Sequence, residues 1–173
     1  MRIVGSLTFG TRLMSNFFQF NLVVPGKPIC KSRPRFTRAG HTYTDKKTFN
    51  HEKLIRGMAK ERMAELGLEP SVDNLEVHMT FYFPMPTSWS KKKKRERFAK
   101  PHTIRPDLDN LVKIIDSLNG VVWEDDCQVY KLFATKLWAV EPATHILILG
   151  EEGRNKFSVV PMNRGEMYEH VAI

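Results

Sequence analysis

The chain has little cysteine, no long apolar run and no cluster of histidines, and each absence excludes a class of protein. Its two cysteines, Cys30 and Cys127, are too few for a disulfide framework in 173 residues. Neither cysteine has a second one at metal-ligand spacing, and the six histidines are scattered, so we expect no zinc site. No apolar run reaches the roughly 18 residues that cross a bilayer. We therefore expect a protein of the reducing cytoplasm with no membrane partner.

Length and composition fit one folded domain. The chain is 42% hydrophobic, which is enough to bury a core. Residues 1–15 contain no solid apolar stretch and no small-residue cleavage site, so we expect no signal peptide there. Residues after 150 lose all periodicity. The sequence therefore predicts an N-terminal extension over residues 1–15, a domain over 16–150 and a tail over 151–173.

Strand and helix signals alternate along the predicted domain. Apolar and polar residues alternate cleanly over 75–83, which is typical of a strand with one buried face. Further strands are predicted over 17–24, 128–140 and 144–149, and helices over 45–66 and 107–118. Thr44 or Asp45 suits the N-cap of the first helix and Gly67 its C-terminal end. We expect the core face of that helix to include Phe49, Leu54, Ile55, Met58, Met63 and Leu66. The order predicts an α/β or α+β domain with a mixed sheet.

Positive charge is concentrated in two segments. The net charge is +8; residues 25–47 carry seven Lys or Arg and one acid, and residues 91–105 carry eight and one. These segments contribute +13 together, so the rest of the chain sums to −5. Local positive charge attracts polyanions, and nucleic acid is the polyanion that we expect. The residues expected to hold backbone phosphates are Lys31, Arg33, Arg35, Arg38, Lys91, Lys92, Lys93, Lys94 and Arg105.

Carboxylates gather between these segments, at Asp107, Asp109, Asp125 and Asp126. An aspartate at a helix start is usually a cap, and two in a turn are usually solvated. Together, beside basic loops, they favour Mg²⁺, a hard ion that takes oxygen ligands. We expect the turn to return beside the helix start, so that Asp107, Asp109 and Asp126 share one ion, with Asp125 as a possible fourth ligand. Convergence of these side chains is the observation on which a nuclease site depends.

Three other side chains have two interpretations each. Lys113 lies one helical turn beyond Asp109, where it can neutralise charge growing on a phosphate or form an ordinary ion pair. Phe36 and Trp89 can stack on unpaired bases, although packing within the protein is the commoner role for such residues.

The acidic segment resembles that of the RusA family of Holliday junction resolvases. The similarity lies in the run Asp107-Leu-Asp109-Asn110-Leu-Val-Lys113, its continuation Asp116-Ser-Leu-Asn-Gly120, and Trp123-Glu-Asp-Asp-Cys-Gln-Val129. Lys31-Ser-Arg33-Pro-Arg35-Phe36 and Tyr43-Thr44 are also similar. The resemblance extends over about residues 17–149.

The resemblance implies a small homodimer with a mixed sheet flanked by helices, of a kind often found in phages and prophages. Such an enzyme would cut four-way DNA junctions in recombination and repair, with Mg²⁺ as cofactor, which Mn²⁺ can replace. Asp107, Asp109 and Asp126 match the family's catalytic, metal-binding aspartates, and Lys113 matches its essential lysine. Asp126 is preferred to Asp125 because it precedes Gln128 and Val129 by the family's spacing.

Three alternative functions differ in the residues that they require. A restriction-type nuclease would need an acid-x-Lys pair, and Asp126 is followed two positions later by Gln128. A non-catalytic junction- or RNA-binding module would use the basic segments but leave the carboxylates without a role. A protein whose acidic patch docks a cationic partner is a third alternative.

Overall fold

Four strands form one mixed sheet in the computed structural model, which describes residues 18–31, 35–36, 42–43 and 45–150. The strands are β1 (Gln19–Pro25), β4 (Leu75–Pro84), β5 (Val129–Ala139) and β6 (Ala143–Gly150), in the order β1-β6-β4-β5. β6 runs antiparallel to both β1 and β4, whereas β5 runs parallel to β4. The predicted mixed sheet in an α+β domain is confirmed.

The central strand β4 shows why the sheet has one buried face. Leu75, Val77, Met79, Phe81 and Phe83 are at most 1% exposed, as their alternation predicts. The positions between them lie on the opposite face and, apart from buried Glu76, are half-buried. The sheet therefore needs cover on one side, which the helices provide.

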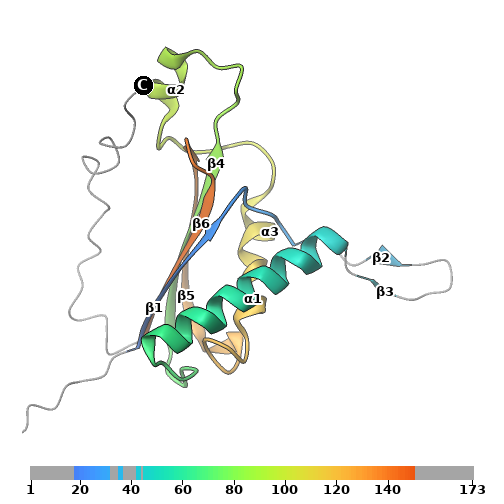
Figure 1. Ribbon diagram of the computed structural model, residues 1–173, viewed down its shortest axis with the longest axis vertical. Helices are drawn as coiled ribbons and strands as arrows, with labels where there is room; N and C mark the ends of the chain where they lie inside the picture. The colour runs from blue at the N-terminus through green and yellow to red at the C-terminus, as the bar shows by residue number, and fades with distance from the viewer. Residues whose placement is uncertain (1–17, 32–34, 37–41, 44, 151–173) are drawn as a thin grey trace, which may run out of the picture.

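Helix α1 (Lys46–Leu66), α3 (Leu108–Val112) and the 3₁₀ helix η1 (Lys113–Leu118) lie on the same side of the sheet, as Figure 1 shows. The Asp45 carboxylate accepts a hydrogen bond from the Lys47 N–H and caps α1. Gly67 adopts the left-handed conformation, φ 61°, that ends the helix. The predicted helix over 107–118 is thus two segments, α3 and η1.

The expected core face of α1 was partly wrong. The buried positions of this helix are Thr48, His51, Ile55, Ala59 and Met63. They follow one another at steps of three or four, which defines a single face of an α-helix. Phe49, Leu54 and Leu66 lie off this face and are 58%, 48% and 40% exposed. Helix geometry, rather than side-chain hydrophobicity, decides which residues reach the sheet.

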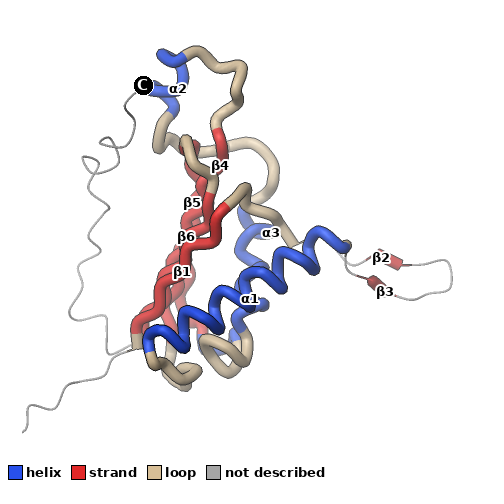
Figure 2. Tube along the Cα trace, in the orientation of Figure 1, coloured by secondary structure: helices blue, strands red, loops and turns tan. Residues whose placement is uncertain are grey.

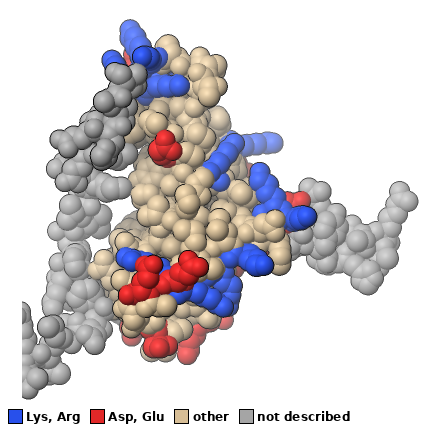
Figure 3. Space-filling model, viewed as in Figure 1, with Lys and Arg blue, Asp and Glu red and all other residues tan. Residues whose placement is uncertain are grey.

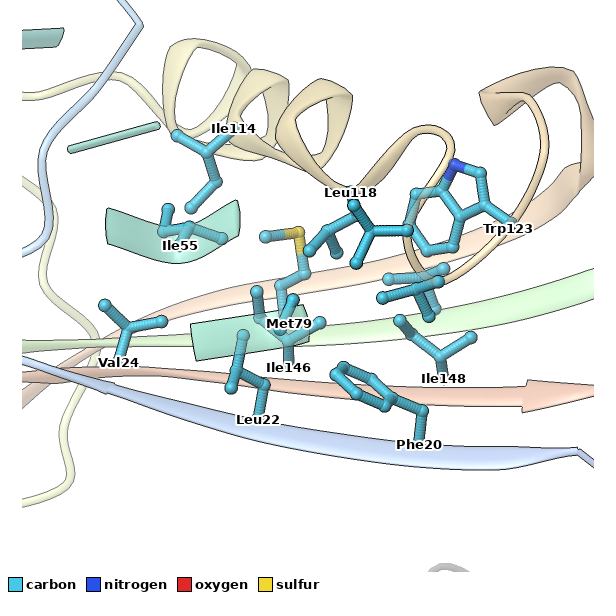
Figure 4. Close-up of a cluster of buried hydrophobic side chains, with 14 of the residues drawn as sticks. Phe20, Leu22, Val24, Ile55, Met79, Ile114, Leu118, Trp123, Ile146 and Ile148 are labelled. Carbon is cyan, nitrogen blue, oxygen red and sulfur yellow. The ribbon is translucent and has the colours of Figure 1, made fainter. Parts of the chain in front are cut away.

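The core lies between this helical layer and the sheet (Figure 4). Ile55 of α1, with Ile114 and Leu118 of η1, meets Met79 and Ile146 from the sheet. Trp123 follows η1 and is fully buried, and its Nε1–H donates a hydrogen bond to the Asn119 side chain. Burial of these side chains stabilises the layer that carries α3.

The remaining elements are short, as the trace in Figure 2 shows. β2 (Arg35–Phe36) and β3 (Thr42–Tyr43) pair antiparallel, α2 spans Lys91–Arg97, and η2 spans Asp126–Gln128. The predicted extension and tail, residues 1–15 and 151–173, lie outside the described residues. Within the described residues, no helix is long and apolar enough to cross a membrane.

Candidate active site

Asp107 and Asp109 stand at the start of α3. Asp107 is the N-cap residue, with extended dihedrals (φ −71°, ψ 145°), yet its side chain makes no capping hydrogen bond. Asp109, in the first turn, is also exposed. Asp107 therefore does not cap the helix through its side chain, which is the commonest structural role of an aspartate at this position. Both carboxylates are available as oxygen ligands, and the helix terminus favours their negative charge.

Lys31 contacts both α3 and η1. The Lys31 N–H donates to the Asn110 carbonyl at 2.9 Å. The Lys31 ammonium lies 3.0 Å from Asp116 and 3.1 Å from Glu52. Burial disfavours its charged form, but the hydrogen bonds to Asp116 and Glu52 outweigh burial and raise the pKa of Lys31. This ammonium is paired with two carboxylates, and its contact with a backbone phosphate stays a prediction.

Lys113 lies beside Asp109, as the spacing predicts. Its Nζ atom is 3.7 Å from Asp109 Oδ2 and donates a hydrogen bond to Asn110 Oδ1 at 3.0 Å. Both members of the ion pair are more than half exposed, so the pair contributes at most about 1 kcal/mol to stability. A lysine held this loosely can move to a bound phosphate at little cost.

Asp125 and Asp126 have different roles in the acidic turn, residues 124–126. Asp125 caps η2: its Oδ1 atom accepts the Cys127 N–H at 2.9 Å, and this bond lowers the pKa of the Asp125 carboxyl. Gln128 completes the capping box by accepting the Asp125 N–H at 3.0 Å. Asp126 is exposed and caps nothing. Of the two neighbours, Asp126 is therefore the one available as a ligand.

Asp126 does not return beside the start of α3 within one chain, contrary to expectation. Lys136 Nζ hydrogen-bonds the Pro106 carbonyl at 2.6 Å, which places the start of α3 near position 136 of β5. Val129, where β5 begins, is seven positions earlier, so at about 3.3 Å per residue Asp126 lies about 20 Å away. α3 and η1 run against the direction of β5, so their far end meets the turn (Figure 1). Within the described ranges, no three acidic, His or Cys side chains are grouped to hold a metal.

The second basic segment forms an exposed helix. Ser90 caps α2, whose Lys91, Lys92 and Lys93 are exposed and Lys94 half-buried. Figure 3 shows Lys and Arg side chains at this end of the molecule, and most of the acidic side chains in the lower half, where further Lys and Arg also lie.

An aromatic contact anchors the α2 end. Trp89 packs on Trp138 of β5 with ring centroids 5.0 Å apart, and Lys93 lies 4.6 Å above the Trp89 ring. Packing, rather than base stacking, is thus the role that the structure gives Trp89.

Of the other expected DNA contacts, Arg105 is exposed next to Pro106. Arg33 and Arg38 lie outside the described residues, and for Arg35 and Phe36 only the backbone of β2 is described.

Sequence reasoning missed two lysines near α3. Lys27 and Lys47 line a cleft of about 470 Å³ that reaches Pro106, the residue before Asp107. Lys27 lies in the first basic segment and Lys47 in the first turn of α1. The sequence shows their charge, but it does not show that both line a cleft that reaches Pro106. Asp45 also lines this cleft, and two lysines against one aspartate leave its lining with a net positive charge.

Comparison with known proteins connects this arrangement to an enzyme family. The family model "Endodeoxyribonuclease RusA" matches residues 25–149, which include every aspartate discussed above. The chain is also 31% identical over 133 residues to "Uncharacterized protein YqaN" of Bacillus subtilis (strain 168), covering 72% of this chain and 92% of that protein. With the Asp-Leu-Asp-Asn run at the start of α3 and the Gln-Val pair where η2 meets β5, the chain belongs to the RusA family of endodeoxyribonucleases, hydrolases that cut DNA phosphodiester bonds at Holliday junctions.

Proposed function

We propose that this protein resolves four-way DNA junctions as a Mg²⁺-dependent homodimer in which each active site combines Asp107, Asp109 and Lys113 of one copy with Asp126 of the other. Nucleases of the family depend on a metal in general, and Mn²⁺ is the expected substitute. The observation that carries the proposal is the pair of exposed carboxylates at the start of α3, of which that of Asp107 makes no capping hydrogen bond. The two free cysteines fit the cytoplasm as its place of work.

The outer edge of β5 supports a dimer. β5 is the last strand of the sheet, and Tyr130, Leu132 and Phe133 along it are 40–47% exposed. Of the residues that the structure describes, 99–102 pair with this edge, and only at its end, through backbone hydrogen bonds with Lys136 and Trp138. An apolar strand edge that the described residues leave open in this way is a surface for pairing with another chain.

Two-fold symmetry would also complete the active site. If two β5 edges pair antiparallel around Leu132, the start of each strand lies opposite position 135 of its partner. Asp126 of one copy then approaches the segment beside Lys136, where the other copy presents Asp107 and Asp109. The separation of about 20 Å within one chain, estimated from the strand rise, is what makes a second copy necessary.

The residues fit a hard divalent cation in chemistry, since the donors are carboxylate oxygens. Such an ion, when bound, polarises a phosphate and lowers the pKa of a coordinated water. Asp107 and Asp109 would hold it beside the scissile phosphate. Lys113 forms an ion pair with Asp109 and donates a hydrogen bond to Asn110. Its ammonium would turn to the phosphate and stabilise the negative charge that develops there.

The cationic surfaces would hold the junction arms. Lys91–Lys94 of α2 and Arg105 would contact backbone phosphates, with Arg33, Arg35 and Arg38 from the first basic segment. Lys27 and Lys47 extend this surface into the cleft beside Pro106. These contacts position the substrate and do not read its sequence.

Subunit complementation tests the proposal directly. Asp107→Asn and Asp126→Asn each remove one carboxylate from every site of a homodimer, so either variant alone should fail to nick a junction. In a mixed dimer the two defects fall in the same site, and the other site is complete. With random pairing, half the dimers are mixed and each has one working site, so nicking should recover to about a quarter of the wild-type rate.

The matched control pairs Asp107→Asn with Asp109→Asn. Both residues come from the same copy, so each site of the mixed dimer carries one defect and no activity should return. A mixed Asp107→Asn and Asp126→Asn dimer, purified by two different tags, that stays inactive would refute the shared site. Wild-type protein that binds junctions tightly yet never nicks them with Mg²⁺ or Mn²⁺ would instead favour the non-catalytic binding module.

A further inference from the structure

Lys136 is a charged residue in an apolar row of the sheet. On β5, Leu132, Ala134, Lys136 and Trp138 pair with the inward-facing positions of β4, and Lys136 lies opposite the fully buried Phe81. Its side chain therefore starts on the helix side of the sheet. The stem of a lysine can lie along apolar surface, but its ammonium needs acceptors there.

Two backbone carbonyls meet this need. Lys136 Nζ donates to Ile104 O at 2.9 Å and to Pro106 O at 2.6 Å. These carbonyls lie on either side of Arg105, and that of Pro106 belongs to the peptide bond that enters Asp107. None of the ion pairs found in the described part of the chain involves Lys136. Two of its three N–H donors are thus directed at the backbone.

The side chain extends an anchor that the backbone begins. Residues 99–102 pair with β5 through hydrogen bonds such as His102 N to Lys136 O, at 2.9 Å. The His102 ring is stacked on Phe83 at 4.1 Å, which fixes that end of the segment. The approach segment, residues 103–106, comes next and leads to Asp107. Lys136 reaches it where backbone pairing with β5 has ended.

We infer that Lys136 is a positioning residue, which fixes the approach segment so that Asp107 stands ready beside Asp109 at the start of α3. The inference rests on the proposed function, because the position of Asp107 matters to activity only if it holds the metal. Removing a group that orients a metal ligand typically lowers metal affinity about 10- to 100-fold. We expect a loss of this size at Lys136, without a loss of DNA affinity.

The test compares Lys136→Met with Lys136→Arg and Lys60→Met in the full-length chain. Methionine keeps the apolar stem and removes the donors, arginine keeps donors and charge, and Lys60 is an exposed lysine of α1. Amide hydrogen exchange over residues 103–111 should be faster in Lys136→Met without metal or DNA, and close to wild type in the other two. Calorimetric titration with Mn²⁺ should show affinity about tenfold or more lower for Lys136→Met alone.

Two results would overturn the inference. Exchange and Mn²⁺ affinity in Lys136→Met equal to wild type would show that Lys136 positions nothing. Unchanged exchange together with weaker junction binding and a salt slope lower by about one would make Lys136 a phosphate contact instead. If wild-type protein neither binds Mn²⁺ nor nicks junctions, the proposed function fails, and with it the role of Lys136 towards a metal. The exchange data would still show whether Lys136 fixes the segment.

Discussion

Replacing Gln128 by alanine should loosen the acidic turn. The Gln128 side chain accepts hydrogen bonds from the N–H groups of Glu124 and Asp125, at 2.9 and 3.0 Å. It donates to the carbonyls of Ser71 and Asp73, at 2.8 and 3.0 Å. One amide thus joins the turn that carries Asp126 to the loop before β4. Alanine removes all of these bonds at once.

The size of the effect follows from these bonds. Each contributes about 0.5–1.5 kcal/mol net, and the lower half of that range applies because the turn is largely solvated. Gln128→Ala should therefore lower the free energy of unfolding by about 2–4 kcal/mol. For a chain of this size that corresponds to a melting temperature lower by about 4–16 °C.

Urea and thermal unfolding measure the loss, and Gln19→Ala is the matched control. Gln19 is an exposed glutamine of β1, so its replacement should change stability by less than about 0.5 kcal/mol. Gln128→Ala should also nick junctions more slowly than wild type while binding them equally well, because the turn carries Asp126 but no basic surface. A Gln128→Ala protein as stable as the Gln19→Ala control would refute this account of the turn.

Three further results are expected. Lys31→Met should lower stability by about 1 kcal/mol at 50 mM salt and by less at 1 M, in urea unfolding, since its two ion pairs are partly exposed and screened. Lys92→Ala should weaken junction binding and reduce the salt slope by about one, in titrations between 50 and 200 mM salt; an unchanged slope would remove α2 from the DNA surface. Burial lowers the pKa of His51, His102 and His145 below 6.5 in the folded protein, so the unfolded chain takes up protons first, and stability should fall as pH drops through about 6.5. Thermal unfolding at pH 7.5 and 5.5 checks this, and equal melting temperatures would contradict it.

Features determined by neighbouring residues could be predicted from the sequence. Asp45 and Gly67 set the ends of α1, and the alternation around Phe81 defined β4. These signals depend on local geometry, so they survive in any tertiary arrangement. Asp126 was preferred to Asp125 on the family's spacing and stays a prediction, with which the capping role of Asp125 is consistent.

Features that depend on distant segments could not be predicted. The direction of β5 places Asp126 far from Asp107, and nothing near Asp126 in sequence reveals that direction. The buried face of α1 includes Thr48 and Ala59, whose positions on the helix outweigh their small apolar surfaces. No sequence motif marks Lys136 as a contact of the segment before Asp107. Its acceptors are backbone carbonyls 30 and 32 residues away, and a backbone carbonyl is present at every position of the chain.

The opposite placement of Asp107 and Asp126 along β5 also has a kinetic consequence. If residues of two copies are needed for every active site, the monomer cannot cleave DNA. Once the protein is diluted below the concentration at which copies associate, the rate of strand breakage should decline with the square of its concentration rather than in proportion to it. A low protein concentration would then be enough to keep the nuclease inactive, without an inhibitor.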